Sequence, residues 1–214
     1  MKSTTWILDT ETDGFEATKF HCMSVINNKE DGPFSTSDPD IMRKIINAND
    51  TFIMHNGQRS DVKWIEDILG VSLETTRIID TLPLSWALFP DYDKHGLYDW
   101  GERLGISKVN ITDWVNLPVS KYIERCETDV RINLGVWDCI YNKLCKLYDN
   151  SDDLNRYIDY LSFKMRCARL QEENKWKVDL RFAHDSLVEL MQERDKKIEV
   201  LTHVMPKVPV MGSR

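Results

Sequence analysis

Two acidic side chains stand two positions apart at the end of an apolar run near the start of the chain. The run Trp6–Leu8 leads directly into Asp9 and Glu11, and Gly14 follows shortly after. Because alternate residues of an extended strand point to the same face, the two carboxylates are expected to lie side by side. Two negative charges at that spacing repel each other unless a cation neutralises them, and a divalent metal ion is the usual solution. The pair therefore predicts a metal site.

The position of this pair distinguishes it from a chance one. The chain has 35 acidic residues among 214, so about six acid-x-acid pairs are expected at random and the spacing alone is weak evidence. Asp9 and Glu11 follow a hydrophobic strand and precede a glycine turn, and the strand ends of α/β sheets are where sites are built. We therefore interpret the pair as functional.

Two further acids, Asp61 and Asp129, occupy settings that suit the same chemistry. Asp61 opens a predicted helix just after His55–Gly57, although an acid there also suits the helix dipole. Asp129 lies inside a long predicted helix among apolar neighbours, where a carboxylate needs a partner such as a metal ion. Four clustered carboxylates are the arrangement with which nucleases hold two Mg²⁺ ions and cleave phosphodiesters. In contrast, we interpret Asp80 as a helix cap and His55 as structural.

The hydrophobic pattern predicts the elements that must bring these acids together. Strands are expected at 6–8, 20–26, 51–54 and 78–79, and helices at 41–46, 61–69, 80–88, 97–104, 119–147, 154–173 and 180–204. The segment Pro33–Pro39 is expected to be a loop. This order predicts an α/β fold over residues 1–148 and a helical extension over 149–214. The last helix carries an apolar stripe that needs a partner surface, formed by Leu180, Ala183, Leu187, Leu190, Ile198 and Leu201.

Composition limits the partners and the compartment. The net charge of −7 argues against a protein that grips nucleic acid unaided, because phosphate binding normally draws on a basic surface. A carboxylate cluster is itself negative until cations load, so we expect weak DNA binding and a partner that delivers the substrate. No apolar stretch approaches the roughly 18 residues that span a bilayer, so no membrane association is expected. The cysteines lack C-x-x-C spacing and are interpreted as reduced thiols of a cytoplasmic protein, namely Cys22, Cys126, Cys139, Cys145 and Cys167.

Taken in order, the motifs resemble those of a known family of nuclease domains. LDTET at 8–12 resembles the first motif of the proofreading 3′-5′ exonuclease domain of family-A DNA polymerases, within the DEDD, ribonuclease-H-like superfamily. HNG at 55–57 together with Asp61 resembles the second motif, and ETDV at 127–130 the third. The similarity is greatest to the replicative polymerases of short-tailed, T-seven-like bacteriophages. It implies a ribonuclease-H-like mixed sheet flanked by helices, and the host cytoplasm as the location if the source is viral.

The resemblance extends beyond the three motifs. IDTL at 79–82 and WGERLG at 100–105 resemble the segment between the second and third motifs, and ARLQEENKWKVD at 168–179 resembles the link into the polymerase part. Because no polymerase motif fits in the remaining residues, we expect either a separately encoded exonuclease subunit or an excised fragment. Both versions predict that a separate polymerase chain docks on the C-terminal helix.

The resemblance also implies a set of ligands and a substrate. Asp9, Glu11 and Asp129 would hold one Mg²⁺ ion, and Asp61 would help Asp9 to hold a second, with Mn²⁺ as an alternative metal. The expected reaction is removal of 3′-terminal nucleotides from single-stranded or mismatched DNA. We also expect Thr10 to contact the terminal nucleotide.

Residues beside the expected carboxylates are candidates for contact with the substrate. Asn56 is expected to contact the terminal nucleotide together with Thr10. Tyrosine-type members carry a tyrosine four residues before the last Asp, where this chain has Arg125, and histidine-type members carry a histidine one position earlier, where it has Glu124. Tyr122 lies one helical turn before Arg125 and is a candidate substitute. Both Tyr122 and Arg125 are thus candidate substrate-binding residues.

Two other functions are consistent with these departures. A catalytically degenerate exonuclease fold that serves as a structural polymerase subunit would explain Arg125. An RNA 3′-exonuclease similar to ribonuclease D would use the same four carboxylates. Degradation of DNA and RNA oligonucleotides separates the enzymes from each other and from the structural subunit.

Overall fold

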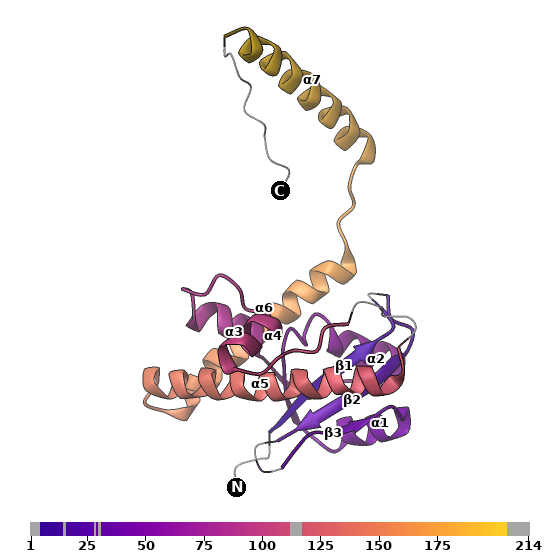
Figure 1. Ribbon diagram of the computed structural model, residues 1–214, viewed down its shortest axis with the longest axis vertical. Helices are drawn as coiled ribbons and strands as arrows, with labels where there is room; N and C mark the ends of the chain where they lie inside the picture. The colour runs from indigo at the N-terminus through magenta and orange to yellow at the C-terminus, as the bar shows by residue number, and fades with distance from the viewer. Residues whose placement is uncertain (1–4, 15, 28, 30, 112–116, 205–214) are drawn as a thin grey trace. The chain divides into compact units, whose positions relative to one another are not determined.

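Five strands form one mixed sheet in the computed structural model, which describes residues 5–14, 16–27, 29, 31–111 and 117–204 (Figure 1). The strand order is β3-β2-β1-β4-β5. Strands β1, β2 and β3 pair antiparallel, whereas β1 pairs parallel with β4 and β4 with β5. Their bounds are β1 Trp6–Thr12, β2 Phe20–Ile26, β3 Phe34–Thr36, β4 Thr51–Met54 and β5 Arg77–Asp80.

The prediction of a loop over Pro33–Pro39 is wrong at its centre. Strand β3 lies there and pairs with β2, and the hydroxyls of Ser24 and Ser35 are 2.8 Å apart across the pair. A three-residue edge strand is too short to show a period-two pattern, and Phe34 is 49% exposed, so no alternation marked it. Main-chain pairing with the neighbouring strand, rather than burial of its own side chains, defines this element.

The helices cover both faces of the sheet. Helices α1 (Pro39–Asn47) and α2 (Asp61–Leu69) pack with one core cluster, which includes Leu8, Phe52 and Ile65. A second cluster lies on the opposite face around Ile7 and Ile53 of the sheet. Because Ile7 and Leu8 are successive in β1, they point to opposite faces, and each face therefore has its own core. The helices of the second cluster are α3 Thr81–Leu88, α4 Leu97–Leu104, α5 Val119–Leu147 and α6 Ser151–Asn174.

Helix α5 is the element that brings the third motif to the sheet. It crosses the sheet beside β1 and β2 (Figure 1). Cys126, Asp129, Val130 and Asn133 are all buried on it, at the three- and four-residue steps of one helical face. Asp129, the carboxylate on this buried face, therefore lies against β1, which carries the first motif.

The chain divides into two compact units, Met1–Glu173 and Asn174–Arg214. Helix α6 contributes Leu154, Ile158 and Leu161 to the core of the first unit. Taken by itself, α7 (Leu180–Val204) buries none of its residues. Residues 205–214 of the predicted extension lie outside the described residues, and the division of the chain after residue 148 stays a prediction. Among the described residues, no helix combines the length and apolarity that crossing a membrane requires.

Candidate active site

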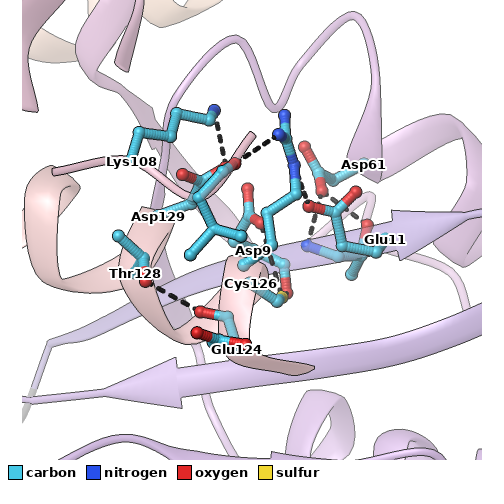
Figure 2. Close-up of polar contacts among 11 residues, drawn as sticks. Asp9, Glu11, Asp61, Lys108, Glu124, Cys126, Thr128 and Asp129 are labelled. Atoms are coloured by element: carbon cyan, nitrogen blue, oxygen red, sulfur yellow. Dashed lines mark hydrogen bonds and ion pairs between the residues drawn. The ribbon is translucent and has the colours of Figure 1, made fainter. Parts of the chain in front are cut away.

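Three carboxylates from two elements meet beside β1. Asp9 and Glu11 come from β1 and Asp129 from α5, and each offers an oxygen within 4.8 Å of the others (Figure 2). Strand alternation places the first two on one face, and the buried face of α5 places the third opposite them. Glu11 and Asp129 are buried. The structure therefore brings together three of the four predicted acids in a group compact enough for one ion.

Asp61 lies next to this group but is held by protein donors. Its Oδ1 accepts hydrogen bonds from the backbone N of Thr10 at 3.1 Å and from the Thr10 hydroxyl at 2.6 Å. Its Oδ2 accepts one from the Ser60 hydroxyl at 2.8 Å. Thr10, which we predicted to contact substrate, thus also links the first motif to the second. The charge of Asp61 helps to raise the pKa of Asp9, which means that the two carboxylates repel each other.

Burial and mutual repulsion raise the pKa values of the cluster. Burial, followed by the charges of Asp129, Asp61 and Glu11, raises the pKa of Asp9 well above its usual range. The pKa of Glu11 rises to about 7 because burial outweighs the nearby Arg125 guanidinium. Burial also raises the pKa of Asp61 and that of Asp129, the latter against the Lys108 ammonium. These acids are therefore poised to release protons when a cation binds.

Two basic side chains contact the cluster. Lys108 Nζ lies 2.7 Å from Asp129 Oδ2, and Arg125 donates from Nε to Glu11 Oε1 at 2.8 Å. Arg125 also donates from Nη1 to the Val109 carbonyl at 2.9 Å. The adjacent residues Lys108 and Val109 thus both contact α5, Lys108 through Asp129 and Val109 through Arg125. Figure 2 shows Lys108 extending over Asp129.

One carboxylate oxygen of the cluster has the surroundings of a metal ligand. Asp129 Oδ1 is buried and has no hydrogen-bond partner among the described residues, although its companion Oδ2 has Lys108. An orphaned carboxylate oxygen in a buried site is costly. Carboxylate oxygens are the ligands that Mg²⁺ and Mn²⁺ prefer. The donor set of Asp9, Glu11 and Asp129 therefore fits a divalent metal.

The turn of the second motif is supported from β5. Asp80 accepts hydrogen bonds from the backbone N of Asn56 at 2.8 Å, of Gln58 at 3.2 Å and of Leu82 at 3.1 Å. Its role is therefore that of a cap for α3, as predicted, and also of a brace for the turn. Asn56 has a φ of 61°, and its side-chain Oδ1 is buried without a partner among the described residues. A strained backbone of this kind often marks a functional position.

The three residues discussed before the third motif differ in their distance from the carboxylates. Tyr122 is 1% exposed and stacks on His21 with ring centroids 3.9 Å apart, within a small cluster that includes Cys126. This burial gives the Tyr122 ring a packing role and does not favour a part in orienting water. Glu124 pairs with Lys121 at 2.7 Å on the exposed side of α5, away from the carboxylates. Only Arg125 of the three reaches the acidic group.

Sequence reasoning missed two side chains of the site. Lys108 follows the end of α4, in a segment without strand or helix periodicity, and no pattern marked it. The Cys126 thiol donates to the Asp9 carbonyl at 3.2 Å and lies 3.4 Å from Asp9 Oδ2. Cys126 precedes Asp129 by three residues, so its place on the same face of α5 could have been found from helical spacing.

Solved structures of similar fold are nucleases and a polymerase. Brucella melitensis NrnC matches with 16% identity and a TM-score of 0.58 for the structure with bound Mg²⁺, over 84% of this chain and 92% of NrnC. The structure of NrnC bound to pGG gives a TM-score of 0.60 over 84% and 90%. Escherichia coli RNase D, described as an exoribonuclease involved in structured RNA processing, matches with 16% identity and a TM-score of 0.52 over 77% and 45%.

A DNA polymerase also shares the fold. The family B DNA polymerase of Pyrobaculum calidifontis matches with 14% identity and a TM-score of 0.54, over 67% of this chain and 25% of the polymerase. No protein-family model matches the chain, and no curated protein sequence matches it. The fold predicted from the sequence is confirmed: the chain has a mixed sheet flanked by helices in a ribonuclease-H-like arrangement.

Proposed function

We propose that the chain is a metal-dependent 3′-5′ exonuclease that removes 3′-terminal nucleotides from single-stranded DNA. The observation that carries this proposal is the meeting of Asp9, Glu11 and Asp129 within 4.8 Å, with Asp61 alongside. A group of buried carboxylates with like charges is unfavourable for folding unless a cation is bound to it, so a purely structural role does not explain it. Its acids come from three separate segments in the order of the exonuclease motifs. The nuclease folds described above support the same chemistry.

The carboxylates and their neighbours have distinct tasks in this proposal. Asp9, Glu11 and Asp129 would hold the divalent metal, which when bound would supply Lewis-acid stabilisation of charge at the phosphorus. Asp61 is kept in place by Thr10 and Ser60. The family resemblance predicts a second ion there, and that number stays a prediction.

The substrate side of the site is formed by residues around the second and third motifs. Asn56 offers a buried amide oxygen at a turn where its φ is positive, which suits contact with the terminal nucleotide. The Arg125 guanidinium carries a permanent charge beside the cluster, which suits a phosphate of the substrate. Unpaired ends enter such a site more easily than paired ends, because unpairing costs free energy.

The experiment is degradation of a 5′-labelled single-stranded DNA by the purified chain in Mg²⁺ and in EDTA. We expect a ladder that shortens from the 3′ end in Mg²⁺ or Mn²⁺ and no cleavage in EDTA. A 3′-phosphorylated DNA of the same sequence is the substrate control. No cleavage with either metal, and with a polymerase chain added, would favour the structural subunit that Arg125 also suits.

RNA is the second candidate substrate. The matches to RNase D and to NrnC bound to pGG favour it, whereas the sequence resemblance favours DNA. The same assay with an RNA oligonucleotide of identical sequence decides between them. At least a tenfold faster rate on RNA would replace the DNA assignment.

The biological setting that we propose is proofreading for a phage family-A DNA polymerase, in the host cytoplasm. The support is the sequence resemblance and the unburied apolar stripe of α7, which suits a separate polymerase chain. Weak binding of DNA by a chain of net charge −7 also suits delivery of the substrate by a partner.

A further inference from the structure

Lys108 and Arg125 bring two positive charges into the acidic cluster. Each contacts a different carboxylate, Lys108 that of Asp129 at 2.7 Å and Arg125 that of Glu11 at 2.8 Å. The side chains of Lys108 and Arg125 are only 14% and 17% exposed. Water therefore screens these charges less than it would screen charges at the surface, and they act on the cluster more strongly than exposed cations would.

The charge balance of the site depends on these two cations. When ionised, the four carboxylates carry a formal charge of −4, which two divalent ions would neutralise. With Lys108 and Arg125 the formal charge is −2, and one divalent ion suffices. A second divalent ion would then give the buried site a net positive charge, which is unfavourable where the dielectric constant is low.

The hydrogen bonds of the carboxylates also favour one ion over two. Asp129 Oδ1 is buried and has no hydrogen-bond partner among the described residues, and it lies in the compact group that Asp129 forms with Asp9 and Glu11. Asp61 already accepts three hydrogen bonds, two from Thr10 and one from Ser60. The carboxylate that would serve a second ion is thus supplied with protein donors.

We infer that Lys108 and Arg125 are built-in cations that reduce the number of tightly bound divalent ions at this site from two to one. The inference rests on the proposed function, since it concerns the metal of that same site. That one ion would be held by Asp9, Glu11 and Asp129. The positive charge that a second ion would supply comes from the two side chains.

The test is Mn²⁺ binding to the full chain, counted by isothermal titration calorimetry and by electron paramagnetic resonance of free Mn²⁺. We expect one ion per wild-type chain and two per chain in the double variant Lys108→Met with Arg125→Met. The surface double variant Lys121→Met with Arg131→Met, on the same helix as Arg125 and with both side chains about half exposed, is the matched control and should bind one ion.

A single variant provides an independent test in case the double variant does not fold. Lys108→Gln is expected to bind its first Mn²⁺ at least about tenfold more tightly than wild type, because it lacks a nearby positive charge. Weaker or unchanged binding would mean that Lys108 only positions Asp129, and would overturn the inference. Two ions of similar affinity in the wild type would overturn it as well. Absence of any Mn²⁺ binding in the wild type would remove the proposed function itself, which separates the two failures.

Discussion

Arg125 donates a hydrogen bond from Nε to Glu11 Oε1 over 2.8 Å, and so joins α5 to the first motif on β1. Its second donor, Nη1, reaches the Val109 carbonyl at 2.9 Å. Tyrosine-type exonucleases carry a hydroxyl at this helical position. In this chain a charged, planar group takes its place, and a guanidinium offers N–H donors but no atom that can accept a proton from water. Its contribution must therefore be electrostatic.

Arg125→Gln tests that contribution. We expect kcat for single-stranded DNA to fall about 10²-fold, as is typical when one preorganised donor to a charged transition state is removed. Arg125→Lys keeps the charge and should retain more activity than Arg125→Gln. Steady-state kinetics at saturating Mn²⁺ are the measurement, with Arg131→Gln on the exposed side of α5 as the control. A change confined to KM would assign Arg125 to substrate binding alone.

Asp9→Asn separates activity from stability. We expect at least a 10³-fold loss of rate, since the amide is a poor ligand for the metal. Without metal, however, the melting temperature should rise, because burial and three neighbouring acids raise the pKa of Asp9 and make its charged form unfavourable. Mg²⁺ should abolish this advantage. Thermal melts with Mg²⁺ and with EDTA check it, and the exposed Asp67→Asn is the control; near-normal activity in Asp9→Asn would contradict the assignment of the site.

The fold and the acids were accessible from the sequence for a common reason. Strand alternation and helical spacing are local properties, so the side-by-side placement of Asp9 and Glu11 and the buried face of Asp129 follow from short segments. The strand pairing confirms the predicted mixed sheet. The three acids of the compact group were all predicted.

The parts that were missed depend on contacts between distant segments. Lys108 belongs to an irregular connection, and only the docking of that connection on α5 brings it to Asp129. Strand β3 is defined by its pairing with β2, which its own residues do not reveal. The burial of Tyr122 against His21 also joins segments about 100 residues apart.

Gly57→Ala tests the turn that holds Asn56. A Cβ at position 57 would lie 2.2 Å from Met54 Cβ, closer than any real contact, so the turn must shift away from the end of β4. We expect a loss of about 1–3 kcal/mol in the free energy of unfolding, in the range of an overpacked core. Urea unfolding measures it. Gly32→Ala meets no atom within 4 Å and should change stability by less than about 0.5 kcal/mol.

Leu187→Glu tests the proposed docking of α7 on a polymerase chain. Leu187 lies on the apolar stripe and is 56% exposed, so a charge there should abolish binding while leaving exonuclease activity within about twofold. Co-purification with the family-A polymerase from the same source is the measurement. Gln192→Glu adds the same charge to α7 off the stripe and should still bind. Unchanged co-purification of Leu187→Glu would contradict the proposed interface.

His55 gives the fold a predictable sensitivity to acid. Its Nδ1 lies 2.9 Å from the Thr81 hydroxyl, and its Nε2 is buried without a partner among the described residues. Burial lowers the pKa of His55 from 6.5 to about 3. Below pH 6.5 the unfolded chain therefore takes up a proton that the native chain does not. The stability that His55 contributes is complete above pH 6.5 and declines by about 1.4 kcal/mol per pH unit down to about pH 3.

Replacing His55 should remove this part of the acid sensitivity. In EDTA, the unfolding free energy of His55→Asn should fall about 2 kcal/mol less than that of wild type between pH 7 and pH 5. The asparagine keeps a polar group near Thr81 but does not titrate, so the difference between the two slopes isolates the histidine from the carboxylates. Urea unfolding at several pH values provides both slopes. His184→Asn changes a side chain that is 73% exposed and should reproduce the wild-type slope; the same slope in His55→Asn would show that His55 is protonated in the folded protein well above pH 3.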